Sequence, residues 1–326
     1  MDPYKYLNIR FNPDGSLTRN GAARILPPAP AGEPVDGDGP TRRIVHSNDA
    51  PLNDANGTTV RLFVPSGPGV GVGDGRLPLV LYFHGGGYVL FRAASEPFHN
   101  TCTALAATIP AVVASVDYRL APEHRLPAAF EDAADAVRWV RSYAAGSPGR
   151  PLFLMGSHAG ASIAFRAALA AVDEGVELQG LILNQPHHGG VKRTAAEESS
   201  VDDRVLPLPA NDLLWELALP LGADRDHEYC NPETMLAGVE AARLRRLPPC
   251  LVLGRRKDPP RDRQRTLVEA LEKTGVTVEA QLDGAGYHAM ELFKQDRAAE
   301  FIAQVADFVR RHAGAGSDVH AGRSRL

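Results

Sequence analysis

Short apolar runs alternate along the chain with longer segments of helical character. Runs typical of buried strands occupy residues 77–83, 111–117, 151–155, 178–184, 249–253 and 276–282. Helical spacing or helix-forming composition marks residues 97–108, 130–144, 162–172, 262–274 and 295–312. An α/β protein with a central, mostly parallel sheet and helices on both faces is the architecture that this alternation predicts.

Other segments interrupt this alternation. Residues 24–41 are rich in Pro, Gly and Ala and predict an extended stretch. Residues 191–240 are irregular, with short helical stretches among Pro and Asp, and we expect residues 313–326 to be disordered. In a parallel sheet the ligand site lies beyond the carboxyl ends of the strands, so the loops that follow strands are the place to look for chemistry.

The bulk composition narrows the function. The chain has 326 residues, 44% hydrophobic and 23% charged, with a net charge of -4 and no basic face for nucleic acid. Its three cysteines show neither metal spacing nor a disulfide pattern. The first residues do not read as a signal peptide, and no apolar run approaches the roughly 20 residues of a membrane helix. We expect a cytoplasmic protein without a cofactor, a metal or a membrane partner, while its oligomeric state stays open.

The most informative motif lies between a predicted strand and a predicted helix. Residues 156–160 read Gly-Ser-His-Ala-Gly. In the G-x-S-x-G elbow of hydrolases, the central serine sits on a strained strand-to-helix turn and attacks the substrate. His158 takes that central position here. Ser157 lies one residue before the apex, so we expect its side chain to point elsewhere.

Three further segments carry candidate chemistry. Residues 84–87 read His-Gly-Gly-Gly, a pattern in which small residues let backbone N–H groups face a developing negative oxygen. Asp258 and His288 each come after a predicted strand. The chain order of elbow, acid and histidine is that of α/β-hydrolases, which predicts that Asp258 orients the His288 imidazole.

These residues carry a family resemblance. The chain resembles the plant carboxylesterases of the hormone-sensitive-lipase group, which also contains the gibberellin receptors and the hydroxyisoflavanone dehydratases. The shared motifs lie at residues 2–7, 12–19, 82–88, 117–124 and 258–264. The resemblance implies an α/β-hydrolase fold in one domain over residues 1–312, with a small cap from about 1–40 and 191–240. It also implies an oxyanion hole made by the N–H groups of Gly85, Gly86 and Ala159.

Departures from the family pattern gather near the expected pocket. The family has serine where this chain has His158, and Pro-Phe-Phe-Gly-Gly where residues 186–190 read Pro-His-His-Gly-Gly. His187 and His188 are therefore candidate pocket residues, together with Ser157 and Tyr88. A metal bound by the histidines is not expected, because no spacing enforces a ligand geometry. The basic residues 255–257 are expected in a solvated loop.

Three functions stay open on this basis. The first is an enzyme that acts on a small carbonyl or ester compound by hydrolysis, elimination or cyclisation, with His158 or His288 as the base. Its serine-dependent ester hydrolysis would be near zero. The second is a non-catalytic small-molecule binding protein, similar to the receptors. The third is an inactive carboxylesterase paralogue, in which His158 only fills the place of the serine.

Overall fold

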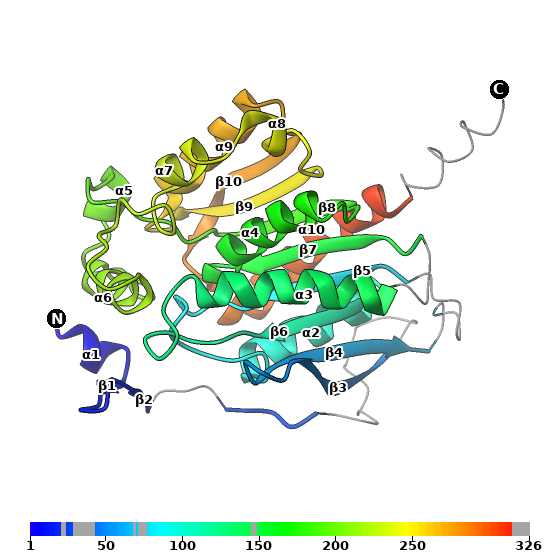
Figure 1. Cartoon of the computed structure of the whole chain (residues 1–326), viewed down its shortest axis with the longest axis horizontal. Helices are drawn as coiled ribbons and strands as arrows, with labels where there is room; N and C mark the ends of the chain where they lie inside the picture. Colours follow the sequence, from blue (N-terminus) through cyan, green and yellow to red (C-terminus); the bar gives the residue numbers. More distant parts are fainter. Residues whose placement is uncertain (21–23, 29–42, 68–69, 71–76, 145–148, 315–326) are drawn as a thin grey trace.

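The computed structural model describes residues 1–20, 24–28, 43–67, 70, 77–144 and 149–314. Its centre is an eight-stranded sheet with the strand order β10-β9-β8-β7-β5-β6-β4-β3 (Figure 1). The strands are β3 (Ile44–Asn53), β4 (Thr58–Ser66), β5 (Leu79–Phe83), β6 (Val112–Asp117), β7 (Leu152–Ser157), β8 (Gly180–Asn184), β9 (Cys250–Lys257) and β10 (Val278–Tyr287). The six strands from β10 to β6 in this order pair in parallel, while β3, β4 and β6 pair antiparallel. The predicted α/β architecture is confirmed.

Helices bury their apolar sides on both faces of this sheet. One core cluster joins the sheet to α3 (Ala128–Ala144), α4 (Ala159–Asp173) and α9 (Arg261–Lys273). A second cluster joins the opposite face to α2 (Glu96–Thr108) and α10 (Gln295–Ala313). Burial of the strands on both faces explains why they read as continuous apolar runs in the sequence.

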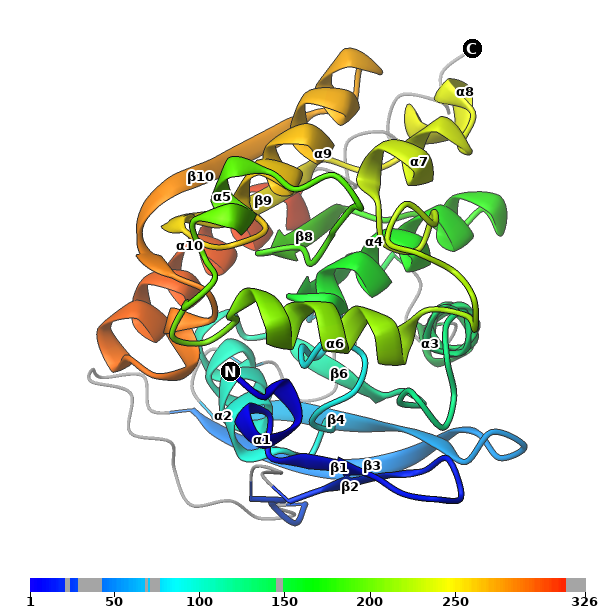
Figure 2. The same cartoon turned by 90° about the vertical axis from the view of Figure 1, so that its left-hand side faces the viewer.

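Short elements from two distant parts of the chain lie over one end of the sheet. They are α1 (Pro3–Tyr6), β1 (Ile9–Phe11), β2 (Leu17–Arg19), α5 (Ala195–Glu198) and α6 (Leu208–Ala218). Figure 2 shows α1 beside α6 at this end. The Tyr6 hydroxyl donates a 2.6 Å hydrogen bond to the carbonyl oxygen of Arg204, and Arg19 pairs with Glu123 at 2.6 Å. These contacts attach the N-terminal segment to the rest of the fold at the end of the sheet where the parallel strands lead into their loops. Two short helices, α7 (Pro232–Ala237) and α8 (Ala241–Leu244), follow before β9.

Some sequence expectations need correction. Residues 255–257 continue β9 rather than forming a solvated loop, and Arg255 is buried with its guanidinium 3.4 Å from Glu300. β10 extends to Tyr287, five residues beyond the predicted strand end. The sequence did not predict β3. The expected extended stretch at 24–41 and the expected disordered tail lie largely outside the described residues.

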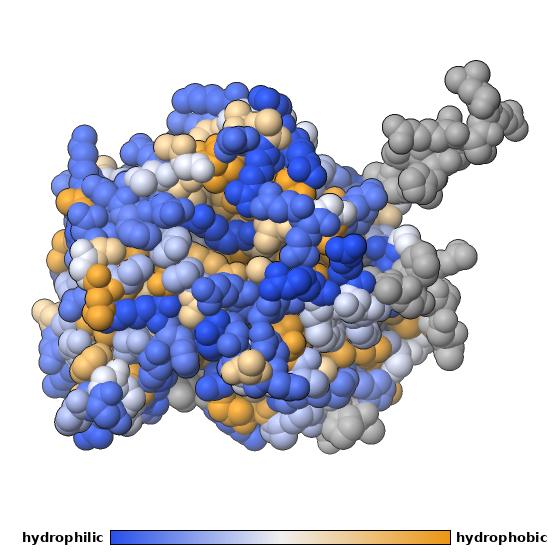
Figure 3. Space-filling view, in the orientation of Figure 1, coloured by the Kyte–Doolittle hydropathy of each residue, from blue (hydrophilic) through white to orange (hydrophobic). Residues whose placement is uncertain are grey.

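The surface view in Figure 3 is predominantly polar, with apolar side chains in scattered places. Within the described part of the chain, no helix has both the length and the apolarity needed to cross a bilayer.

Candidate functional site

The turn from β7 into α4 has the geometry of a nucleophile elbow. His158 has φ 57° and ψ -117°, and α4 begins at the next residue. A Cβ on Gly156 would lie 2.0 Å from the carbonyl oxygen of Gly160, and one on Gly160 would lie 2.0 Å from that of Phe83. Only glycine fits at these two positions, so strand and helix can approach closely enough to hold the central residue in a strained conformation.

The imidazole of His158 is buried between three groups. A Cβ on Gly85 would lie 2.7 Å from its Cδ2 atom, so the ring packs directly against the glycine loop. The ring centroid is 4.4 Å from that of His288, and Nε2 is 3.4 Å from Oε1 of Glu291. Burial lowers the pKa of His158, and the neighbouring His288 lowers it further. The neutral imidazole is therefore the favoured form of His158.

Asp258 and His288 form the hydrogen-bonded pair that the chain order predicts. His288 Nδ1 and Asp258 Oδ1 are 2.7 Å apart, and the second carboxylate oxygen accepts a 2.7 Å hydrogen bond from Gln264. Burial opposes a charge on His288, but the Asp258 carboxylate outweighs burial and raises the pKa of the imidazole, with a smaller contribution from Glu291. Nδ1 is occupied by this contact, so Nε2 is the nitrogen free for a ligand.

Glu291 is a site residue that no motif in the sequence indicates. It lies in the short 3₁₀-helix η1 (Met290–Leu292), and its side chain is 3% exposed. Its carboxylate accepts hydrogen bonds from Asn184 at 2.6 Å and Gln185 at 3.0 Å, both at the end of β8. Burial opposes ionisation, but the contact with His158, the backbone N–H of Glu291 and the hydrogen bond from Asn184 lower the pKa of Glu291 to about 2. An ionised carboxylate thus lies beneath the elbow.

The side chain of Ser157 is occupied elsewhere. Its hydroxyl oxygen accepts hydrogen bonds from the Tyr82 hydroxyl at 3.1 Å and from Asn184 at 3.3 Å. Ser157 is buried and does not line the cavity described below. This placement agrees with the expectation that its side chain points away from the apex.

The remaining candidate pocket residues separate into two groups. His187 lines the cavity, with its Nε2 2.6 Å from Asn211 Oδ1 and its ring stacked on Trp215 at 4.6 Å. His188 and Tyr88 are almost fully buried and are not among the cavity-lining residues. Burial lowers the pKa of His187 to about 3 and the pKa of His188 to about 4, so both imidazoles are neutral near pH 7.

The glycine loop after β5 runs beside the elbow. Gly86 has φ 115° and Gly87 has φ 63°, conformations that favour glycine, and a Cβ on Gly86 would lie 2.2 Å from the carbonyl oxygen of Leu90. Gly85 contacts His158 from the loop side, while Ala159 is fully buried as the first residue of α4.

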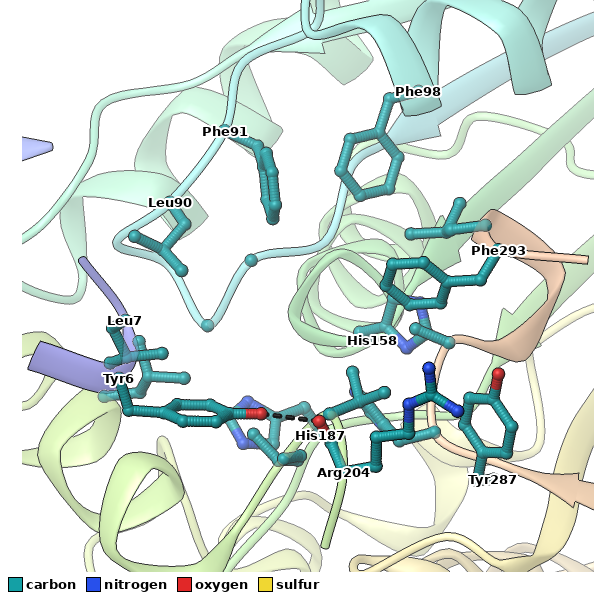
Figure 4. Close-up of a pocket in the computed structure, with 18 of the residues that line it drawn as sticks. Tyr6, Leu7, Leu90, Phe91, Phe98, His158, His187, Arg204, Tyr287 and Phe293 are labelled. Atoms are coloured by element: carbon teal, nitrogen blue, oxygen red, sulfur yellow. Dashed lines mark hydrogen bonds between the residues drawn. The ribbon is translucent and has the colours of Figure 1, made fainter. Parts of the chain in front are cut away.

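A cavity of about 580 Å³ opens at these residues, a size suited to a small-molecule ligand (Figure 4). Gly86, His158, His187 and His288 form its polar floor. Its walls are mainly apolar and come from the N-terminal segment, from α2, α6 and η1, and from loops: Leu7, Leu90, Phe91, Phe98, Val205, Leu206, Leu214, Leu292 and Phe293. In the described residues no group of three or more His, Cys, Asp and Glu side chains is arranged to hold a metal ion.

Comparison with known proteins agrees with this architecture. A family described as "alpha/beta hydrolase fold" matches residues 80–292. "Probable carboxylesterase 8" of Arabidopsis thaliana is 41% identical over 97% of this chain and 95% of its own length. The "3-O-acetylpapaveroxine carboxylesterase CXE2" of Papaver somniferum is 38% identical over 94% of this chain and 99% of its own length.

More distant similarity extends to a receptor and to a solved esterase. "Gibberellin receptor GID1B" of Arabidopsis thaliana is 35% identical over 62% of this chain and 57% of its own length. A hyperthermophilic esterase structure from Pyrobaculum calidifontis matches with a TM-score of 0.71 and 28% identity over 83% of this chain and 84% of that one. The eight-stranded sheet, the elbow geometry and these matches agree, and the chain belongs to the family of carboxylesterase-like α/β-hydrolases.

Proposed function

We propose that the protein is a carboxylesterase-like enzyme that acts on a small carbonyl or ester compound with His288 as general base and without a serine nucleophile. The observation that carries this proposal is the 2.7 Å contact between His288 and Asp258, made by a histidine that lines the cavity. A carboxylate that fixes the imidazole and favours its protonated form is what a general base requires.

In the hydrolytic version of this proposal, water supplies the nucleophile. His288 Nε2 takes a proton from water while the water oxygen bonds to the carbonyl carbon. The N–H groups of Gly85, Gly86 and Ala159 hold the resulting oxyanion. The intermediate then expels the alkoxide, which takes the proton back from His288. The same base can instead remove a proton from a carbon next to the carbonyl, which starts an elimination or a cyclisation.

His158 takes the serine position in this proposal, and its surroundings argue against a direct role as base. The imidazole is nearly enclosed, packs on Gly85 and directs Nε2 towards Glu291. We therefore assign His158 to the floor of the site and the proton transfer to His288. Ser157 does not replace the missing serine, because its hydroxyl is bonded to Tyr82 and Asn184.

One observation favours a second function, non-catalytic binding. His158 fills the elbow against Gly85 and occupies space that an acyl group would need. A protein that only binds its ligand needs the cavity but no nucleophile, so histidine in place of serine at position 158 would not impair it. An inactive paralogue would likewise keep the fold without turnover.

The two functions separate in a hydrolysis assay on p-nitrophenyl butyrate. We expect slow turnover by the unmodified protein, at most the roughly 10³–10⁴-fold over water that an oxyanion hole and binding provide. We expect His288→Ala to abolish that turnover. The control His124→Ala replaces an exposed histidine outside the cavity and should leave the turnover unchanged. Equal rates for the unmodified protein and His288→Ala would reject the base assignment and favour binding.

The elbow is tested by restoring the serine. We expect His158→Ser to hydrolyse the ester at least about 10²-fold faster, because a lost nucleophile costs about 10⁶-fold in comparable enzymes. A fluorophosphonate probe should label the His158→Ser variant at the introduced hydroxyl and leave the unmodified protein unlabelled. Labelling of Ser157 in the unmodified protein would contradict the proposal.

A further inference from the structure

The charges that face the cavity are of one sign. Apart from its histidines, the ionisable groups lining it are Tyr6, Tyr287, Arg204 and Lys294, and no Asp or Glu side chain of the described residues lines it. Arg204 follows α5, whereas Lys294 caps α10. Two distant segments therefore each bring a cation to the same apolar cavity.

Arg204 is held in place by its backbone while its side chain stays free. Its carbonyl oxygen accepts the 2.6 Å hydrogen bond from Tyr6, and the next two backbone N–H groups donate to the Asp203 carboxylate at 2.8 Å. In the view of Figure 4 the Arg204 side chain extends in the direction of Tyr287. Neither this guanidinium nor the Lys294 ammonium has a hydrogen bond or ion pair with another described residue.

The adjacent acidic residue does not neutralise Arg204. Asp203 directs its carboxylate towards the backbone of Val205 and Leu206, so it fixes the loop and not the guanidinium. Other arginines near the site are paired: Arg263 lies 3.1 Å from Glu197, and Arg261 lies 3.2 Å from Asp262. Arg204 and Lys294 are exposed, so water can reach both cations. An unpaired guanidinium on a fixed backbone is well suited to bind a carboxylate in a bidentate manner.

We propose that the cavity takes an apolar ligand with a carboxylate, which binds Arg204 and Lys294 while the apolar body lies against Phe91, Phe98 and Leu206. This inference rests on the proposed function only in taking the cavity as the substrate site. The carbonyl that reacts would face His288 and the glycine loop. The carboxylate would lie where Arg204 and Lys294 line the cavity.

The test compares two ligands of matched size that differ in charge, 1-naphthaleneacetate and 1-naphthaleneacetamide, by isothermal titration calorimetry on the full chain. We expect the acid to bind about two- to fivefold more tightly at low salt, the range of about 0.4–1 kcal/mol that exposed charge pairs contribute. The preference should decrease as ionic strength rises, because exposed charges are screened.

The variants Arg204→Gln and Lys294→Gln should each reduce the preference for the acid and leave amide binding unchanged. Arg310→Gln on the exposed side of α10 removes the same charge away from the cavity and should change neither affinity. Equal affinity for acid and amide, or no binding of either at millimolar concentration, would overturn the inference. If His288→Ala loses turnover but still binds the acid more tightly than the amide, the ligand inference holds independently of the catalytic proposal.

Discussion

His158 Nε2 lies 3.4 Å from Glu291 Oε1, with both side chains at most 5% exposed. The Glu291 carboxylate also accepts hydrogen bonds from Asn184 and Gln185, so it holds the elbow residue to the end of β8. The histidine at the apex is therefore part of a buried polar network, and its partner belongs to the same 3₁₀-helix region that follows His288.

Removal of Glu291 should destabilise the fold. Glu291→Ala leaves two buried amides without their acceptor, and each unmet group costs about 1–3 kcal/mol. We expect a loss of about 2–4 kcal/mol in the free energy of unfolding, measured by urea denaturation. The exposed control Glu269→Ala should change it by no more than about 0.5 kcal/mol. An equally small effect of Glu291→Ala would show that the network does not stabilise the protein.

The same carboxylate should make stability sensitive to acid. The folded-state pKa of Glu291 is lowered to about 2 from an unfolded value of 4.5. Its contribution is therefore complete above about pH 4.5 and is lost as the pH falls towards 2. We expect Glu291→Gln to weaken the acid dependence of the free energy of unfolding between these values. An unchanged slope would indicate that other carboxylates dominate acid unfolding.

The sequence predicted the sheet well because its parallel strands are buried on both faces and read as uninterrupted apolar runs. β3 was missed, since its segment contains Asn, Asp and Pro and lies at the edge of the sheet, where one side is exposed. The predicted β9 and β10 are too short because β9 ends in Gly, Arg and Lys and β10 ends in a run with Asp and two Gly, which break the apolar pattern.

The site was predicted in part for a related reason. Asp258 and His288 follow strands in an order that a known motif describes, so the amino-acid sequence alone predicts their pairing. No spacing rule connects position 158 with Glu291. Their contact depends on the short 3₁₀-helix after His288 and on the way that β8 ends beside β7. Arg204 was also missed, because the fold of an irregular segment decides which of its charges face the cavity.

The pH dependence of turnover should report the His288–Asp258 pair. Burial favours the neutral imidazole, but Asp258 outweighs burial and raises the pKa of His288 above the ordinary histidine value of 6.5. The neutral base therefore forms only as the pH rises above 6.5. In the His158→Ser variant we expect kcat/KM to rise with pH through an apparent pKa above 6.5. Adding Asp258→Asn should move this rise in kcat/KM to lower pH and reduce kcat by about 10³–10⁴-fold. If the rise in kcat/KM stays at the same pH in this double variant, a group other than His288 is titrating.

The contact between the elbow and the glycine loop yields a double-variant cycle. A Cβ on Gly85 would lie 2.7 Å from His158 Cδ2 and 3.1 Å from the Ser157 carbonyl oxygen. Gly85→Ala should therefore destabilise the protein by about 1–3 kcal/mol, a range typical of overpacking. A His158→Ala background removes the 2.7 Å clash with Cδ2 and leaves two milder contacts, with the Ser157 carbonyl oxygen at 3.1 Å and with the Cβ of residue 158 at 3.2 Å, so the same substitution should cost at least about 1 kcal/mol less. Gly238→Ala, whose Cβ would meet nothing closer than 3.6 Å, should show no such coupling. Additive effects of Gly85→Ala and His158→Ala in chemical denaturation would mean that the imidazole does not press against the loop in solution, and the role of His158 as the packed floor of the site would then be wrong.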